Sequence, residues 1–130
     1  LRGCPVDNMA LVEVVAEFVQ GRRPNIPEYS DCVECKRKGT PCVMVSQGTP
    51  CLGPVTQAGC GALCPSYLRG CYGCFGPMES PNTEMLAAAW QRLGVSHREL
   101  VDAYRGFNAY AEPFRITSDH YEALAVARGE

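Results

Sequence analysis

The chain has 130 residues, which is enough for one domain with a modest core. Hydrophobic residues make up 46%, charged residues 20% and the formal net charge is −2, so the composition excludes a disordered chain and carries no general basic signature for nucleic acid. No apolar stretch reaches the roughly 18 to 20 residues that a membrane-spanning helix needs, and the N-terminus lacks a secretory pattern, so we expect a cytoplasmic protein.

One helix is predicted near the N-terminus. Asp7 or Asn8 can cap its first turn, and Gly21 with Pro24 can end it. The pattern predicts a helix over about residues 8–20, on which apolar side chains recur at helical spacing: Met9, Val12, Ala16 and Val19.

The centre of the chain is rich in cysteine, glycine and proline. Of the 9 cysteines, Cys4 stands apart and the others fall between residues 32 and 74. This segment shows no helical or alternating period longer than a few residues, so something other than an apolar core must hold it together. Its cysteines are Cys32, Cys35, Cys42, Cys51, Cys60, Cys64, Cys71 and Cys74.

Three more helices are predicted after the last cysteine. Asn82 or Thr83 can cap a helix over about residues 83–93, and Gly94 follows it where a left-handed C-cap is preferred. Ser96 and Glu99 form a capping box ahead of a second helix that extends to Phe107. A third is expected over about residues 118–128.

These elements predict a small fold of helices and irregular segments. It divides into an N-terminal turn and helix (residues 1–28), a loop-rich cysteine segment (29–80) and a helical extension (81–130). His97 and His120 lie on predicted helices far from every cysteine, so we expect capping or surface roles for them. Neither completes a catalytic arrangement and no phosphate-binding loop is present, so no catalytic residue is expected in this chain.

Disulfides, structural zinc and iron–sulfur clusters can each hold a loop-rich segment together. An odd number of cysteines without an export signal fits a disulfide framework poorly. Cys32-x2-Cys35 and Cys71-x2-Cys74 have the spacing of zinc-binding pairs, so spacing alone leaves two zinc sites open.

Three features favour two [4Fe–4S] clusters over zinc. Cys60-x3-Cys64-Pro65 has the cysteine–proline ending of bacterial ferredoxin motifs. Glycines lie among the cysteines, where they let backbone N–H groups approach a sulfide. Side chains that could shield a redox centre alternate with the later cysteines: Leu63, Tyr67, Leu68, Tyr72 and Phe75.

The order of these motifs resembles the small subunit of nickel–iron hydrogenases. In that family a C-x-G-P-x-T-x4-C segment precedes a C-x-G-C pair, as do Cys51-Leu-Gly-Pro-Val-Thr-Gln-Ala-Gly-Cys60 and Cys71-Tyr-Gly-Cys74 here. Arg2-Gly-Cys-Pro-Val6 resembles the family's G-C-P motif. Asp31-Cys-Val-Glu-Cys-Lys-Arg-Lys38 is most similar to the cytosolic, multi-subunit, sulfhydrogenase-like members, and the resemblance covers roughly residues 2–77.

The resemblance implies a ligand assignment that uses every cysteine. Cys4 would be one ligand of a proximal cluster, whose other ligands lie in the family's upstream flavodoxin-like domain. Residues 1–28 would be the tail of that domain, which we expect to be missing from this chain or supplied by another polypeptide. A distal [4Fe–4S] cluster would be held by Cys32, Cys35, Cys42 and Cys51, and a medial one by Cys60, Cys64, Cys71 and Cys74.

Two departures from the membrane-associated members of the family imply low reduction potentials. Cys32 stands where those members have a histidine, and Cys64 stands where they have a proline that leaves a three-iron cluster. A thiolate in place of an imidazole adds negative charge and disfavours the reduced state. Low potentials suit an acceptor near the potential of hydrogen, such as a nicotinamide nucleotide.

The resemblance thus implies an electron-transfer subunit of a nickel–iron hydrogenase. Its partners would be a large subunit with the Ni–Fe centre and diaphorase-like subunits that carry flavin, iron–sulfur clusters and NAD(P). We expect these partners, or the upstream domain, to cover the apolar faces of residues 8–20 and 83–93. A basic run follows Cys35. It could offset the negative charge of the clusters, contact a partner protein or form a solvated turn, and it consists of Lys36, Arg37 and Lys38.

Two alternatives to this function stay open. One is a ferredoxin-like electron-transfer subunit of a different redox complex, which would keep the eight central ligands but lack the hydrogenase partner. The other is a zinc-stabilised interaction module. Neither alternative includes a nucleic-acid partner or a membrane span.

Overall fold

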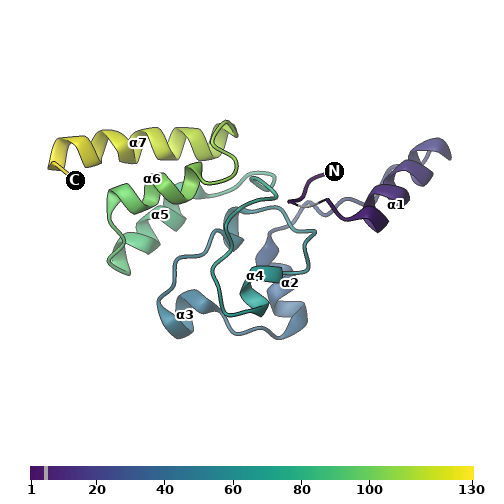
Figure 1. Ribbon diagram of the computed structural model, residues 1–130, viewed down its shortest axis with the longest axis horizontal. Helices are drawn as coiled ribbons and strands as arrows, with labels where there is room; N and C mark the ends of the chain where they lie inside the picture. Colours follow the sequence, from purple (N-terminus) through teal and green to yellow (C-terminus); the bar gives the residue numbers. More distant parts are fainter. Residues whose placement is uncertain (5) are drawn as a thin grey trace.

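The computed structural model describes residues 1–4 and 6–130, so Pro5 of the G-C-P motif lies outside the described residues. Within that part the chain forms α-helices, one 3-10 turn and isolated bridges of Ser30 with Gln57 and of Thr56 with Pro77, but no β-strand. Figure 1 shows the cysteine segment between two helical ends. The predicted combination of helices and irregular segments is confirmed, and no helix described here could cross a membrane.

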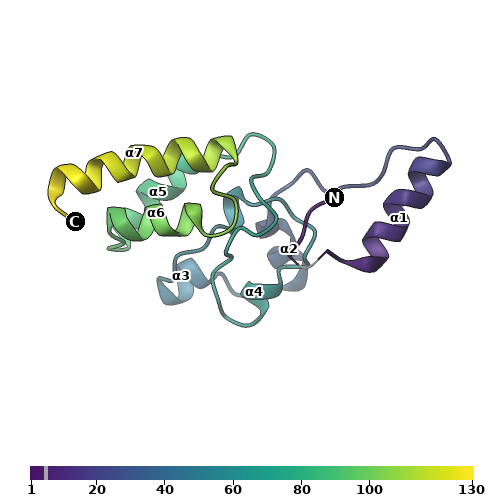
Figure 2. The ribbon, with the colours of Figure 1, turned by 45° about the horizontal axis from the view of Figure 1, so that its top comes forward.

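The C-terminal helices pack into a small bundle, seen in Figure 2 as α7 lying along α5 and α6. The bundle consists of α5 (Thr83–Arg92), α6 (His97–Arg105) and α7 (Glu112–Arg128). Aromatic rings fill its centre, since the ring of Tyr104 lies 6.0 Å from that of Trp90 and 5.3 Å from that of Phe114. Burial of such large side chains is the main source of stability for a bundle of this size.

The bundle covers a helix face that we expected a partner to cover. Leu86, Ala87 and Trp90 of α5 are all buried within the chain's own core. The expectation that another chain buries the apolar face of residues 83–93 is therefore wrong for Leu86 and Trp90, whereas Met85 and Leu93 stay exposed. The reason is that α6 and α7 close over this face.

The ends of the bundle helices follow their predicted caps in part. The Asn82 carboxamide accepts the backbone N–H of Met85 at 3.1 Å, and the Ser96–Glu99 capping box forms. The second helix was predicted to reach Phe107, but α6 ends at Arg105 and leaves Phe107 exposed. The third helix begins at Glu112 rather than 118 because Pro113 occupies its first turn, where a missing N–H costs nothing.

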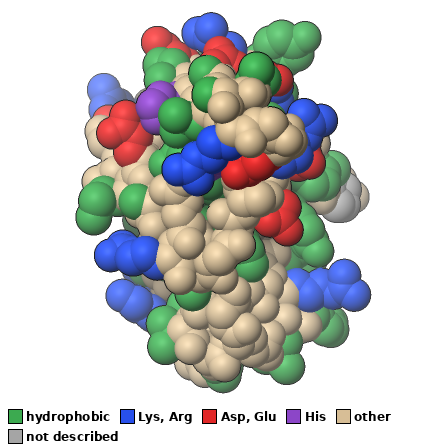
Figure 3. All heavy atoms as spheres, turned by 90° about the vertical axis from the view of Figure 1, so that its left-hand side faces the viewer, with side chains coloured by type: hydrophobic (Ala, Val, Ile, Leu, Met, Phe, Trp, Pro, Cys, Tyr) green, Lys and Arg blue, Asp and Glu red, His purple; other side chains and the backbone are tan. Residues whose placement is uncertain are grey.

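Polar contacts join α6 to α7 along the outside of the bundle. The Arg105 guanidinium donates to the Glu122 carboxylate at 2.7 and 2.9 Å and to Asp119 at 2.9 Å. Figure 3 shows acidic and basic side chains gathered over this end of the molecule. His97 is only 3% exposed, with its ring 2.8 Å from Gln91 and 3.3 Å from Glu130, so a surface role for His97 is wrong.

The cysteine segment contains short helices that periodicity did not predict. They are α2 (Asp31–Lys38), α3 (Val43–Gln47), the 3-10 turn η1 (Gly53–Val55) and α4 (Leu63–Ser66). Gly39 and Gly48 end α2 and α3 in the left-handed conformation. The segment is anchored on the bundle because Leu52 and Val55 belong to the same buried cluster as Trp90.

Helix α1 (Asn8–Val19) extends away from the rest of the molecule, as Figures 1 and 2 both show. The Asp7 carboxylate caps it by accepting the backbone N–H of Met9 at 3.0 Å, and none of its residues is buried. Two hydrogen bonds connect the ends of this segment to neighbouring residues. The backbone N–H of Asn25 donates to the Glu17 carboxylate at 3.0 Å, and the Arg2 guanidinium donates to the Pro77 carbonyl at 2.6 Å.

We predict that Leu100→Ala lowers the free energy of unfolding by about 2 to 5 kcal/mol, because Leu100 is 0% exposed and truncation leaves a cavity in the bundle. Met85→Ala, at a position 61% exposed on α5, should change it by less than about 0.5 kcal/mol. Denaturant unfolding followed by circular dichroism measures both. Equal losses in the two variants would contradict the assignment of the core.

Candidate metal centre

Four cysteines surround one cavity of about 100 Å³ between α2, α3 and η1. Cys32 and Cys35 are three residues apart on α2, so a single helical face presents both sulfurs to the cavity. Cys42 precedes α3 and Cys51 precedes η1, and each reaches the cavity from its loop. These are the four residues expected to hold the distal cluster.

The backbone around Cys51 is arranged to support a thiolate. The Cys51 sulfur accepts the backbone N–H of Cys71 at 3.1 Å and that of Gly53 at 3.4 Å. A Cβ atom at Gly53 would lie 3.3 Å from the Cys51 sulfur and 3.4 Å from the Cys32 sulfur. Glycine at this position therefore keeps open the space between two of the four sulfurs, where an inorganic group would lie.

The environment of these sulfurs opposes ionisation in the absence of a cation. Burial, together with the charges of Cys51 and Cys35, raises the pKa of Cys32 to about 12. Burial and the charge of Asp31 raise the pKa of Cys35 to about 11. Thiolates are the form that binds metal, so a metal or cluster must supply the positive charge that lets this set ionise. An all-sulfur donor set around a largely apolar cavity fits zinc or iron–sulfur and excludes hard cations such as magnesium.

The cysteines expected to hold the medial cluster differ from one another in their hydrogen-bond partners. The Cys60 sulfur donates to Asp31 at 3.4 Å, and the Cys71 sulfur accepts the backbone N–H of Gly73 at 3.4 Å. Burial, followed by the charges of Cys64 and Cys4, raises the pKa of Cys74. The structure thus brings Cys74 within electrostatic reach of Cys64 and of the exposed Cys4, and the grouping of these cysteines around one cluster stays a prediction.

Two acidic residues at this site were missed in the sequence. Asp31 is 0% exposed, and burial is the main cause that raises its pKa to about 6. Its carboxylate lies with that of Glu34 and the Cys60 sulfur in one group whose ligand atoms are all within 4.8 Å of one another. The available signal in the sequence was that Asp31 and Glu34 each directly precede a cysteine of the Cys32-x2-Cys35 pair.

The basic run after Cys35 forms the last turn of α2, and its three side chains are exposed. Lys36 lines the cavity of the four cysteines, the Arg37 guanidinium lies 4.9 Å above the Tyr29 ring, and Lys38 donates to the Gly61 carbonyl at 2.8 Å. The position of Lys36 supports the interpretation that this run offsets negative charge at the cysteines.

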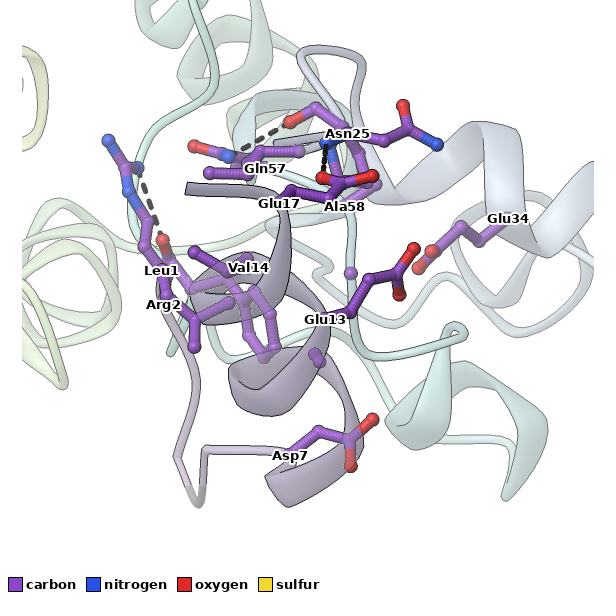
Figure 4. A pocket seen from close by; sticks show the side chains of 15 residues that line it. Leu1, Arg2, Asp7, Glu13, Val14, Glu17, Asn25, Glu34, Gln57 and Ala58 are labelled. Carbon is purple, nitrogen blue, oxygen red and sulfur yellow. Dashed lines mark hydrogen bonds between the residues drawn. The ribbon is translucent and has the colours of Figure 1, made fainter. Parts of the chain in front are cut away.

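A second cavity of about 200 Å³ lies between α1 and the cysteine segment and is shown in Figure 4. Its walls include the carboxylates of Glu13, Glu17 and Glu34, and no cysteine lines it. Ala10 and Val14 line it together with Glu13 and Glu17, so a mixed face of α1 is turned toward the cysteine segment.

The cysteine arrangement has the donor set of an all-thiolate metal or iron–sulfur site, and the chain is similar to subunits of hydrogenases. The chain is 45% identical over 75 residues to the delta subunit of sulfhydrogenase 2 from Pyrococcus furiosus, covering 58% of this chain and 32% of that protein. It is 30% identical over 140 residues to a subunit of the vhu F420-non-reducing hydrogenase from Methanococcus voltae, covering 92% and 48%.

A third relative carries the cofactor in its name. The chain is 40% identical over 74 residues to the iron–sulfur subunit of the F420-non-reducing hydrogenase from Archaeoglobus profundus, covering 55% of this chain and 20% of that protein. The chain spans half or less of the length of these three curated relatives. No protein-family model matches it. The resemblance to sulfhydrogenase-like hydrogenase subunits is therefore confirmed.

We predict that Gly53→Val removes the metal bound by the four-cysteine cavity, because its side chain would press on the sulfurs of Cys51 and Cys32. Metal analysis of the anaerobically purified chain measures this loss. Gly106→Ala is the control, since a Cβ there meets only ordinary contacts at 3.5 Å. A Gly53→Val protein with the full metal content would show that this space is not the binding site.

Proposed function

We propose that this chain holds two [4Fe–4S] clusters and acts as an electron-transfer subunit of a nickel–iron hydrogenase. Cys32, Cys35, Cys42 and Cys51 would hold one cluster, and Cys60, Cys64, Cys71 and Cys74 the other. The observation that carries the proposal is that the four cysteines of the first set, from Cys32 to Cys51, line a single cavity. The chain is also homologous to hydrogenase subunits. A cluster bound there would take up and release one electron at a time.

A relative that is named an iron–sulfur subunit supports iron–sulfur clusters over zinc. The Cys60-x3-Cys64-Pro65 motif supports the same choice, because its cysteine–proline ending is that of bacterial ferredoxin motifs.

The role of this chain's own residues is to hold and tune the clusters. The backbone N–H groups of Gly53 and Cys71 donate to the Cys51 sulfur, which stabilises its negative charge. Lys36 adds positive charge at the same cavity. Apolar neighbours such as Val43 limit the access of water. The reaction with hydrogen would take place in a large partner subunit, and a flavin- and NAD(P)-binding partner would receive the electrons.

The orientation of α1 supports a partner on its outer side. The helix turns Ala10, Glu13 and Glu17 toward the cavity of Figure 4, whereas Val15 and Val19, which do not line it, are 52% and 79% exposed. An amphipathic helix normally buries its apolar side. We therefore propose that another part of the hydrogenase covers the exposed side, as was expected for residues 8–20.

We predict that Cys64→Ala converts the cluster of the second set into a three-iron centre and raises its reduction potential, because one iron loses its thiolate. Electron paramagnetic resonance of the oxidised protein should show the new three-iron signal. Cys4→Ala should leave both four-iron clusters unchanged. If Cys64→Ala keeps the wild-type spectrum and iron content, Cys64 is not a ligand.

We predict that Val15→Glu combined with Phe18→Glu abolishes co-purification of the nickel-containing partner while the visible absorbance of the clusters is retained. Charges placed on the exposed apolar side of α1 would have to be buried in the complex at high cost. Val126→Glu, at an exposed position on α7, is the matched control. Persistence of the complex in the α1 variant would place the contact elsewhere.

A further inference from the structure

Helix α2 presents two different faces to the cysteine segment. Cys32, Cys35 and Lys36 line the four-cysteine cavity. Asp31, Glu34 and Lys38 are spaced three and four residues apart and so share another face of the helix, and all three contact the segment from Cys60 to Ser66. One short helix therefore touches both expected cluster sites, with a separate row of side chains for each.

The Glu34 carboxylate makes the closest of these contacts with the backbone beside Cys60. Its Oε2 atom accepts the backbone N–H of Gly61 at 2.9 Å and that of Ala62 at 3.2 Å. Both N–H groups thus meet at one carboxylate oxygen, and both residues have positive φ, 69° at Gly61 and 50° at Ala62. Ala62 is fully buried in a left-handed conformation that is unfavourable for a residue with a side chain, and the bond to Glu34 offsets part of this strain.

Two further contacts fix the same segment on α2. The Lys38 ammonium donates to the Gly61 carbonyl at 2.8 Å and to the Ser66 hydroxyl at 2.9 Å. The Cys60 sulfur donates to Asp31, but this bond needs a proton that a metal-bound thiolate no longer has. The Glu34 and Lys38 bonds involve no cysteine sulfur and can therefore persist when both clusters are bound.

We infer that Glu34 is a positioning residue that fixes the Cys60 loop, and the cluster it would bind, at a set distance from the cluster bound by α2. The inference rests on the proposed function, since it assigns Cys60 to one cluster and Cys32 and Cys35 to the other. Electron transfer between two clusters depends steeply on their separation. A rigid link between the two ligand segments therefore keeps this separation constant while a partner binds and leaves.

The test compares three variants of the full chain purified anaerobically: Glu34→Ala, Glu34→Gln and Glu84→Ala. The glutamine amide keeps an oxygen that can accept the two N–H groups, whereas alanine removes it. Glu84 is also an acidic residue in the first turn of a helix, is exposed, and lies on α5 away from the cysteine segment, so it controls for the loss of a helix-terminal charge. The measurements are iron and sulfide content and the spin–spin interaction between the two reduced clusters in electron paramagnetic resonance.

We expect Glu34→Ala to lose the wild-type spin–spin splitting, with the cluster of the Cys32 set retained, and Glu34→Gln to restore it. Wild-type splitting in Glu34→Ala would overturn the inference, and so would equal loss in Glu34→Gln and Glu34→Ala. Absence of iron and sulfide from the wild-type chain would instead overturn the proposed function. If Glu34→Ala fails to fold, the comparison of Glu34→Gln with the wild type decides. A retained splitting in Glu34→Gln supports the inference that the oxygen at this position fixes the Cys60 loop, and a lost splitting contradicts it.

Discussion

Four sulfurs converge on one cavity beside α2, and each of them makes ionisation of its neighbours less favourable. Burial and mutual repulsion raise the pKa of Cys32 to about 12 and that of Cys35 to about 11, so these groups stay protonated in the chain by itself. A cationic group in the cavity reverses this balance, and the binding free energy then becomes folding free energy for the loops that carry the cysteines. The open space at Gly53 and the N–H groups aimed at Cys51 are the features that such a group requires.

The rest of the chain supplies what the cysteine segment lacks. The α5–α7 bundle has its own aromatic core, and Leu52 and Val55 extend that core beneath the cysteine loops. Backbone geometry completes the attachment: Gly70 approaches the Pro50 carbonyl so closely that no side chain could be accommodated, and the Asn108 amide donates to the Gly73 carbonyl at 2.7 Å. Packing and backbone contacts thus anchor the cysteine loops on the bundle.

The parts of this arrangement that depend on local signals could be predicted from the sequence. Caps at Asp7, Asn82 and Ser96 located three helix starts, because a side-chain oxygen three residues or fewer from an N–H acts within one turn. The gathering of Cys32, Cys35, Cys42 and Cys51 at one cavity was implied by the family resemblance rather than by a local signal. Helix α2 was missed because its eight residues carry no apolar period, and the contacts of Glu34 depend on positive φ at Gly61 and Ala62, which only the folded loop reveals. That α5 is covered by α6 and α7 follows from tertiary packing, which no local pattern records.

Iron and sulfide analysis of the anaerobically purified wild-type chain, combined with electron paramagnetic resonance of its reduced form, tests the central claim most directly. Two four-iron clusters predict about eight irons and eight sulfides per chain, together with the signals of reduced cubanes. A colourless protein with two zinc ions and no sulfide would contradict the account and would remove the basis for a role in hydrogen-linked electron transfer.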